Sequence, residues 1–253
     1  MKLNYKISSS YQNKSTKLEY FISKFNASGN VIFDGGRNQI RTYTLADKTI
    51  NIKSFKIPNF INKIAYRFFR KSKALRSFEY AEKLTKLGIG TPQPIAFYEY
   101  YSVLFFNKSF YVSKHLNYDL TFRELTTNLD YPNHEKILRA FTRFTFELHE
   151  KGVNFLDHSP GNTLIQINKN DYSFYLVDLN RMRFEQMDIN QRLKNFSKLT
   201  NHQSLVKVMS AEYAILSELP FDEVYKKMWF YTEEFQEKLQ RKKRLKQKYL
   251  GRK

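Results

Sequence analysis

The chain has 253 residues, enough for one large domain or two lobes around a buried core. Hydrophobic residues make up 42% of it and aromatic residues 17%, which excludes a disordered chain, and 8 glycines and 6 prolines exclude a collagen-like or linker-dominated one. The 43 Lys and Arg against 24 Asp and Glu give a net charge of +19, so we expect an anionic partner: nucleic acid, acidic lipid headgroups, phosphorylated glycolipids or nucleotides.

The absence of cysteine excludes disulfides, thiolate catalysis and cysteine-ligated zinc, and suits a reducing cytosol. The first twenty residues lack the apolar core of a signal peptide, and the densest apolar run, Tyr100–Phe106, is far too short to span a bilayer. Any association with a membrane is therefore expected to be peripheral.

The first half of the chain predicts mostly strands. A short helix is expected around residues 18–25, where apolar side chains repeat at helical spacing. Residues 58–73 form a basic helical insertion, followed by a helix over Ala74–Leu87 that ends at Gly88. The predicted strands cover residues 30–34, 39–45, 49–55, 95–106 and 109–113.

The second half is mostly helical, with helices predicted over 120–125 and 133–151 and a hairpin over 163–177. This order predicts an α+β protein in two lobes, a strand-rich N-lobe of residues 1–114 and a helical C-lobe of residues 115–253. The tail from Glu237 onward holds nine Lys or Arg against a single Glu. It is interpreted as a solvated helix end, an electrostatic anchor for an anionic surface, or both.

The segment from Leu148 to Leu164 carries the most information about function. A helix ends at Gly152, a loop presents Asp157, Asn162 follows after four intervening residues, and a strand begins at once. This order is typical of the catalytic loop of protein-kinase-like enzymes. A further Asp178, flanked by apolar residues, follows the hairpin and strengthens the interpretation.

Phosphoryl transfer explains this spacing, because a metal ion must bridge the nucleotide phosphates while the acceptor alcohol gives up its proton. Asn162 and Asp178 offer oxygen ligands for a hard cation such as Mg²⁺. Asp157 fits the role of the base that receives the proton. The alternative is that Asp157 and Asn162 only cap a turn and that Asp178 only ends a strand.

A kinase also needs a strand lysine for the α and β phosphates of ATP and a helical glutamate to hold that lysine. Lys53 lies in the middle of a predicted strand, and Glu79 lies on the helix that follows the basic insertion. Lys56 and Glu82 are their rivals. The alternative for Lys53 is a solvent-facing position on an alternating strand.

The turn of Gly35, Gly36, Arg37 and Asn38 joins the first two predicted strands, where kinases fold backbone amides over the phosphates. It lacks the full G-x-G-x-x-G pattern, so an ordinary hairpin turn is an equal interpretation.

From Gly35 to Phe184 the sequence resembles the lipopolysaccharide kinase family, the Kdo kinase and heptose kinase relatives of the protein-kinase fold. The similarity extends beyond the catalytic loop. It includes the segments Pro58–Ile64, Arg67–Phe69, Ala74–Tyr80 and Leu87–Ala96.

The resemblance implies ATP-dependent phosphorylation of a sugar hydroxyl, on Kdo or heptose, in the inner core of lipopolysaccharide. The enzyme would be cytoplasmic, peripheral at the inner face of the cytoplasmic membrane, where its basic residues meet an acidic glycolipid. The resemblance also implies a hinge near Ser113–Leu116 that touches adenine. The implied roles are an ion pair of Lys53 with Glu79 that positions ATP, Asp157 as base, and Asn162 and Asp178 on Mg²⁺.

Three features depart from the family's pattern. Phe155 stands where a histidine is common, His158–Gly161 is an unusual link between Asp157 and Asn162, and Leu179–Asn180 replaces the Phe-Gly of ordinary kinases. Asn180 is able to enter the left-handed backbone region that a glycine would use. His158, beside Asp157, is either a packing residue or a contact to phosphate or acceptor, whereas His149 is expected to pack or cap at its helix end.

Two other functions compete with an active kinase. One is a pseudokinase-like nucleotide-binding module, against which the intact set of Lys53, Asp157, Asn162 and Asp178 argues. The other is a nucleic-acid-binding protein, but the aromatic residues fall at core-like spacing and no RNA or DNA motif is present, so no nucleic-acid partner is expected. The acceptor, whether Kdo, heptose, another glycolipid or a protein hydroxyl, stays open.

Overall fold

The computed structural model describes residues 2–36, 38–56, 59–169 and 171–250. It divides into two compact units, Met1–Asn117 with Asp178–Asn180, and Tyr118–Val177 with Arg181–Lys253. Pro58, where the predicted basic insertion begins, lies outside the described residues, as does Arg37 of the glycine turn.

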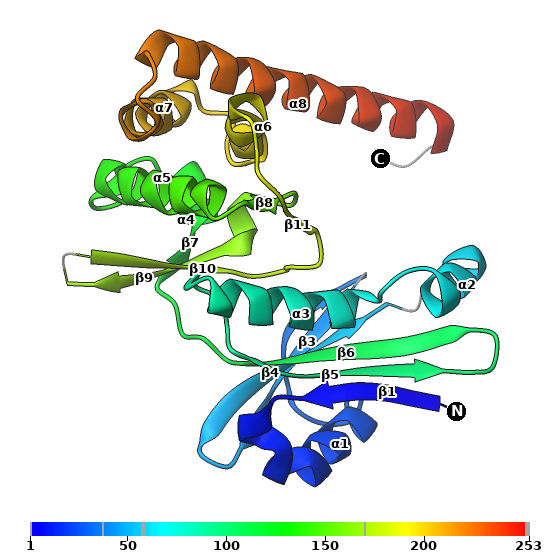
Figure 1. Ribbon diagram of the computed structural model, residues 1–253. Helices are drawn as coiled ribbons and strands as arrows, with labels where there is room; N and C mark the ends of the chain where they lie inside the picture. Colours follow the sequence, from blue (N-terminus) through cyan, green and yellow to red (C-terminus); the bar gives the residue numbers. More distant parts are fainter. Residues whose placement is uncertain (1, 37, 57–58, 170, 251–253) are drawn as a thin grey trace. The chain divides into compact units, whose positions relative to one another are not determined.

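The first unit is built on a six-stranded antiparallel sheet with the strand order β1-β5-β6-β4-β3-β2 (Figure 1). β4 lies inside the sheet, between β3 and β6. The strands are β1 (Lys2–Ile7), β2 (Asn30–Gly35), β3 (Asn38–Leu45), β4 (Lys48–Phe55), β5 (Pro94–Tyr101) and β6 (Phe106–Lys114).

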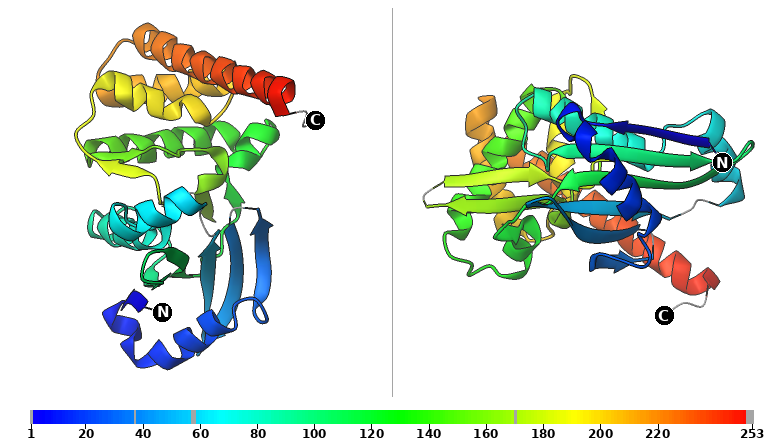
Figure 2. Two further views of the ribbon diagram at one scale, coloured as in Figure 1. Left: turned by 90° about the vertical axis from the view of Figure 1, so that its right-hand side faces the viewer. Right: turned by 90° about the horizontal axis from the view of Figure 1, so that it is seen from below.

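Helices cover both faces of this sheet, as the views in Figure 2 show. Because side chains alternate along β4, Ile50 and Ile52 are fully buried against Leu18 of one helix, while Phe55 packs with Phe78 of another on the opposite face. The helical elements of the unit are η1 (Ser9–Lys14), α1 (Ser15–Ser23), α2 (Phe60–Phe68) and α3 (Lys73–Lys86).

Two details of this unit differ from the prediction. The strand predicted over 95–106 ends at Tyr101, and the chain turns over residues 102–105, where the Ser102 Oγ accepts a bond from the Phe105 N–H at 3.1 Å. The apolar run continues through this turn, so its composition hides it. β1 was not predicted, although Leu3, Tyr5 and Ile7 alternate with polar residues along it; five of its six residues are exposed, and it forms an edge of the sheet.

The second unit is mainly helical, with small sheets of order β10-β9-β7 and β11-β8. Its core packs aromatic and aliphatic side chains of α4, α5, α7 and α8. The helix predicted from residue 120 begins at Phe122, because Thr121 and Glu124 form a capping box. The elements are β7 (Leu120–Thr121), α4 (Phe122–Thr127), α5 (His134–Glu150), β8 (Val153–Phe155), η2 (Pro160–Asn162), β9 (Thr163–Asn168), β10 (Asp171–Leu176), β11 (Met182–Phe184), α6 (Ile189–Lys194), η3 (Asn195–Lys198), α7 (Gln203–Ser217) and α8 (Phe221–Leu250).

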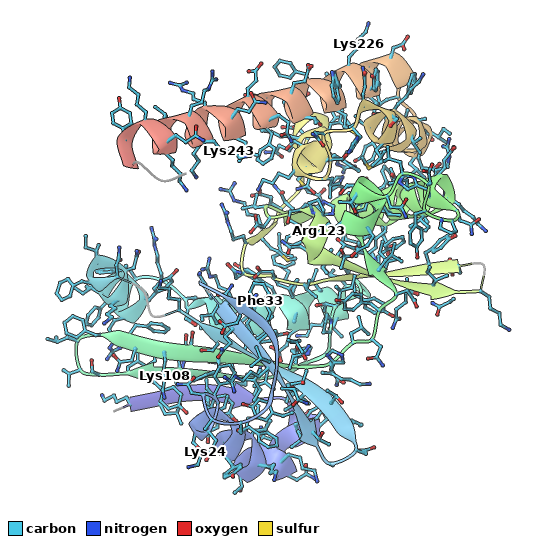
Figure 3. All side chains as sticks on the ribbon, turned by 180° about the vertical axis from the view of Figure 1, so that it is seen from behind. Lys24, Phe33, Lys108, Arg123, Lys226 and Lys243 are labelled. Carbon is cyan, nitrogen blue, oxygen red and sulfur yellow. The ribbon has the colours of Figure 1, made fainter. Side chains whose placement is uncertain are left out.

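Helix α8 contains the described part of the basic tail. Its N-terminal half buries Val224, Met228 and Thr232, whereas residues 237–249 are exposed. Figure 3 shows Lys226 and Lys243 extending from this helix away from the ribbon. In the part of the chain that the structure describes, no helix is both long and apolar enough to cross a bilayer.

Candidate active site

The predicted catalytic loop begins where α5 ends. Gly152 has φ of +66° and a Cβ there would lie 3.2 Å from the Glu185 carbonyl oxygen, so a glycine suits this position on both counts. β8 then pairs with β11, and the Leu156 N–H donates to the Arg181 carbonyl at 3.1 Å. The strand that leads into Asp157 is thereby hydrogen-bonded along its length to the segment that begins at Arg181.

Asp157 is partly exposed and lies beside two cations of the same unit. The Lys198 Nζ is 3.6 Å and the Arg181 Nη1 3.8 Å from its Oδ1 atom. Lys198 also donates to the Leu156 carbonyl at 2.5 Å, so this ammonium is tied to the backbone of the loop. The carboxylate therefore faces solvent in a positive local field.

Asn162 closes the loop that starts at Asp157. Its Nδ2 donates to the Asp157 carbonyl at 2.8 Å, which leaves the Oδ1 atom as the one suited to a hard cation. The Asn162 carbonyl accepts from the Val177 N–H at 3.0 Å, and Asp178 is the next residue in the chain. The described residues contain no cluster of three or more His, Asp or Glu side chains able to hold a metal ion by themselves.

Lys53 and Asp178 form an ion pair within the first unit. The Lys53 side chain is 14% exposed, and its Nζ lies 2.8 Å from the Asp178 Oδ1 atom. The alternative of a solvent-facing Lys53 is therefore wrong, because the side chain projects from the sheet face that α3 covers rather than into water. The same Asp178 oxygen accepts from the Asn180 Nδ2 at 2.6 Å.

The left-handed residue of this segment is Asp178, with φ of +58°, and not Asn180. A strained backbone at a carboxylate with two charged or polar partners is typical of a functional position. Asn180 instead uses its side chain to hold the Asp178 carboxylate.

The two candidate glutamates of α3 have other partners. Glu79 pairs with Lys71 at 2.7 Å, and Glu82 pairs with Lys6 at 2.9 Å. The structure thus brings Lys53 together with Asp178 and does not form the expected Lys53–Glu79 pair.

Gly35 and Gly36 form the turn end of β2, where Gly35 is in register with Asn38. Neither glycine has a positive φ, and a Cβ at Gly36 would meet no atom within 4 Å. The turn lines a hollow of about 370 Å³ together with Ser54 and the rival Lys56, and Lys53 is not part of its lining. A Cβ at Gly35, in contrast, would lie 2.5 Å from the Phe33 ring, so the close approach of this side chain favours glycine at that position.

The predicted hinge, Ser113–Leu116, begins in the last two residues of β6. The His115 N–H donates to the Thr49 carbonyl at 2.9 Å, and its Nδ1 lies 2.9 Å from the Asn51 Oδ1. These bonds attach the hinge segment to β4, the strand of Lys53.

Asn195 of η3 is a polar residue that sequence reasoning missed. Its Nδ2 donates to the Phe155 carbonyl at 2.9 Å, and its Oδ1 lies 3.0 Å from the Nδ1 of His158 and 3.4 Å from the Nε2 of His149. Since an amide oxygen only accepts, both ring nitrogens must carry protons. Asn195 therefore connects α5, β8 and the residue after Asp157.

Both histidines are fully buried and neutral. Burial lowers the pKa of His149 to about 3 and that of His158 to about 4. His158 packs between the rings of Phe141 and Phe155, so the interpretation that it touches phosphate or acceptor is wrong. Phe155, at the family's histidine position, likewise fills the core.

A hollow of about 330 Å³ opens beside the catalytic loop, within the second unit. Leu156, Tyr231 and Phe235 give it apolar walls. Three lysines also line it, namely Lys194, Lys198 and Lys238, against the single carboxylate of Glu234. The hollow therefore combines ring surfaces with a positive charge, next to the residue that precedes Asp157.

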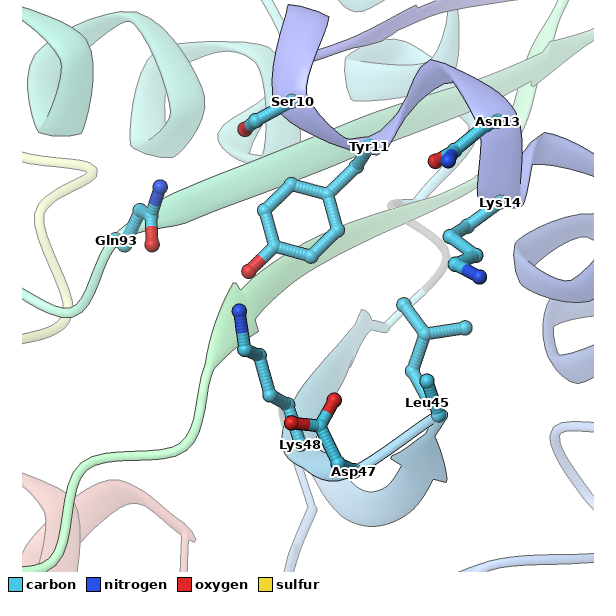
Figure 4. Close-up of a pocket in the computed structure, with 9 residues that line it drawn as sticks. Ser10, Tyr11, Asn13, Lys14, Leu45, Asp47, Lys48 and Gln93 are labelled. Atoms are coloured by element: carbon cyan, nitrogen blue, oxygen red, sulfur yellow. The ribbon is translucent and has the colours of Figure 1, made fainter.

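A smaller hollow of about 220 Å³ lies in the first unit, at the β3–β4 turn. Figure 4 shows Tyr11, Lys48 and Gln93 around it. It contains none of the predicted site residues.

Two comparisons with known proteins found matches for this chain. The sequence profile described as "Lipopolysaccharide kinase (Kdo/WaaP) family" matches residues 39–218. The solved structure "WaaP in complex with acyl carrier protein" superimposes with a TM-score of 0.64 at 15% identity, over 94% of this chain and 99% of that chain. The search of curated proteins gave no match.

The fold is thus the predicted α+β, protein-kinase-like one, with a strand-rich sheet in its N-terminal part and helices in its C-terminal part. The chain belongs to the lipopolysaccharide kinase (Kdo/WaaP) family, which confirms the resemblance seen in the sequence.

Proposed function

We propose that this protein is a Mg-ATP-dependent kinase that transfers the γ-phosphate to a sugar hydroxyl of the lipopolysaccharide inner core. The observation that carries the proposal is the loop in which Asn162 holds the backbone of Asp157 and accepts a bond from Val177, the residue before Asp178. The bond to Val177 extends the β9–β10 ladder by one pair, so the hairpin fixes the backbone of Asn162 opposite the residue before Asp178.

The N-lobe, residues 1–114, is proposed to bind the nucleotide. Lys53 carries a nearly buried positive charge, suited to the α and β phosphates of ATP. Glu79 is the partner proposed for Lys53 when nucleotide is bound, and the Gly35–Gly36 turn is proposed to cover the phosphates. The hinge at Ser113–Leu116 is proposed to touch the adenine.

Oxygen ligands fit a hard cation, so the Asn162 Oδ1 and the Asp178 carboxylate are the atoms proposed to hold Mg²⁺. When bound, this ion supplies the charge that neutralises the transferring phosphoryl group. With one amide and one carboxylate from the protein, the remaining ligands are left to the nucleotide and water.

In the C-lobe, residues 115–253, Asp157 is proposed to orient the acceptor hydroxyl and to receive its proton as the O–P bond forms. Lys198 and Arg181, both within 4 Å of Asp157, keep a positive charge beside this carboxylate. This charge attracts an anionic acceptor to Asp157.

The acceptor is proposed to be an acidic glycolipid, with Kdo and heptose both open. The three lysines of the hollow beside Leu156 suit a carboxylate or phosphate on the sugar, and Tyr231 offers a ring face to it. We also propose a peripheral location at the inner face of the cytoplasmic membrane, where the exposed cations of α8 meet acidic headgroups.

The test is to incubate the protein with Mg-ATP and a Kdo-containing lipid A precursor and to read phosphate addition by mass spectrometry. We expect the glycolipid to gain one phosphate, and the gain to vanish in Asp178→Ala but persist in Asp130→Ala, which removes an exposed loop carboxylate. If ATP binds without metal dependence and neither this lipid nor a heptose-containing core is phosphorylated, the pseudokinase-like module replaces the proposal.

A further inference from the structure

A cluster of large apolar side chains is exposed on the first unit, on helix α2 and beyond it. Helix α2 has no buried residue. Two further apolar residues lie at the tip of the β5–β6 hairpin. We call this set the apolar edge, and its members, between 55% and 83% exposed, are Phe60, Ile61, Phe68, Phe69, Val103 and Leu104.

The helix and the hairpin tip form one surface. The rings of Phe60 and Phe105 lie 5.3 Å apart, those of Tyr66 and Phe106 lie 5.6 Å apart, and the Arg67 Nε donates to the Val103 carbonyl at 3.4 Å. Figure 1 shows α2 beside the turn that joins β5 and β6. The apolar edge is therefore held in place from beneath, while its members face solvent.

An exposed apolar surface of this extent indicates a partner that covers it. The charges around it identify the chemistry of that partner. Between Ile57 and Phe78 every charged residue is positive. These residues are Lys63, Arg67, Arg70, Lys71, Lys73 and Arg76.

The cations lie at the margin of the apolar side chains rather than apart from them. The Arg67 guanidinium lies over the rings of Phe68 and Tyr101, 5.2 Å from each centroid. A helix with phenylalanines on one face and lysines and arginines beside them is suited to the boundary between acyl chains and anionic headgroups. An acidic protein would match the charges but would require a shaped apolar groove of its own.

We propose that the apolar edge inserts shallowly into an anionic lipid bilayer, with its phenylalanines among the acyl chains and the neighbouring cations at the lipid phosphates. The inference deepens the proposed membrane location and rests on it, because it names the surface and the mode of contact. Its test contains no nucleotide, so the kinase assignment and this inference can fail separately.

The first experiment measures co-sedimentation with vesicles of phosphatidylcholine and of phosphatidylcholine mixed equally with phosphatidylglycerol. We expect binding to the anionic vesicles, and a loss of at least about tenfold in partition for Ile61→Ser/Phe69→Ser, since two large apolar side chains would leave the membrane. Both side chains are exposed, so the variant is expected to fold. The matched control is Ile215→Ser, because Ile215 is 73% exposed on α7, outside the apolar edge, and should bind like wild type.

The second experiment measures depth. In Phe69→Trp, brominated lipids should quench fluorescence beyond the level given by Trp229, the single tryptophan of the wild type. Equal binding of wild type and the double variant, or no additional quenching, would overturn the proposal and leave the basic tail as the anchor. Self-association in the absence of vesicles that the double variant abolishes would assign the edge to a second copy of this chain instead.

Discussion

At the scale of single residues, the proposed chemistry depends on side chains that act on substrate or metal and on side chains that hold the catalytic loop in place. Asp157, Asn162 and Asp178 are the groups proposed to act on substrate or metal, and their order along the chain makes them predictable. Asn195 and Lys198 contact the segment around Asp157 from about 40 residues further on. No motif connects these two residues to the loop, so only the folded chain shows that they contact it.

Asn195 should be a strong determinant of stability. In Asn195→Ala the buried N–H groups of His149 and His158 and the Phe155 carbonyl lose a partner. An unsatisfied buried polar group costs about 1 to 3 kcal/mol, so we expect the free energy of unfolding to fall by roughly 2 to 4 kcal/mol, measured by urea denaturation. Asn190→Ala, on the exposed side of α6, is the control, and equal stability of the two variants would contradict this role.

The pairing of Lys53 shows a limit of residue-level prediction. Strand position and apolar neighbours indicated Lys53 as the phosphate-binding lysine, which stays a prediction, but they do not determine which carboxylate it meets. Three candidate carboxylates, Asp178, Glu79 and Glu82, are distant from Lys53 in the sequence. In the structure Lys53 pairs with Asp178. The choice depends on the left-handed backbone at Asp178, which aims its carboxylate.

At the scale of elements, strong periodicity was enough to predict the larger parts. α3 and α5 differ from their predicted ranges by a residue or two, and the β9–β10 hairpin lies where it was expected. The misses have physical causes. β1 is a short edge strand that pairs with β5 from far away in the sequence, and its alternation of Leu3, Tyr5 and Ile7 was overlooked. The turn at residue 102 lies within an apolar run.

The basic insertion also shows why charge alone did not predict the function of this segment. Its cations were evident in the sequence and favoured an electrostatic function. The exposure of its phenylalanines became evident only when α2 proved to have no buried face. An amphipathic pattern normally indicates a helix packed on a core, whereas this helix contacts the β5–β6 hairpin through a few rings and fully buries none of its residues.

At the scale of the whole molecule, burial of two neutral histidines makes stability depend on pH. The folded-state pKa values, about 3 for His149 and about 4 for His158, lie below the ordinary value of 6.5. At a pH between the folded-state and ordinary values, the unfolded chain therefore binds more protons than the folded one. Their contribution is therefore complete above pH 6.5 and is lost as pH falls toward 4. Each ring should account for about 2 kcal/mol of the free energy of unfolding between pH 6.5 and 5.

Urea denaturation at pH 7, 6 and 5 measures this dependence. His149→Gln should reduce the change with pH by about the share of one ring, whereas His202→Gln, which replaces the residue at the start of α7, should leave it unchanged. A pH dependence that is the same in wild type and His149→Gln would show that carboxylates, and not the buried rings, control stability in this range.

The high net charge is the other property of the whole molecule, and it was fully visible in the sequence. Composition alone left nucleic acid, lipid and nucleotide as equal partners. The fold and the family narrow these to the partners of a lipopolysaccharide kinase. In the proposal made above, the acceptor sugar is selected by the shape of the hollow beside Leu156, which neither charge nor spacing encodes.

The central claim is that Asp157 receives the acceptor's proton during phosphoryl transfer, and the direct measurement is the transfer rate of Asp157→Asn. We expect the rate from Mg-ATP to a Kdo- or heptose-containing lipid to fall by about 10² to 10⁴ with ATP affinity nearly unchanged, because the amide keeps the shape and loses the base. Asp130→Asn, which alters an exposed carboxylate, should match the wild type. A near-normal rate in Asp157→Asn would contradict the account.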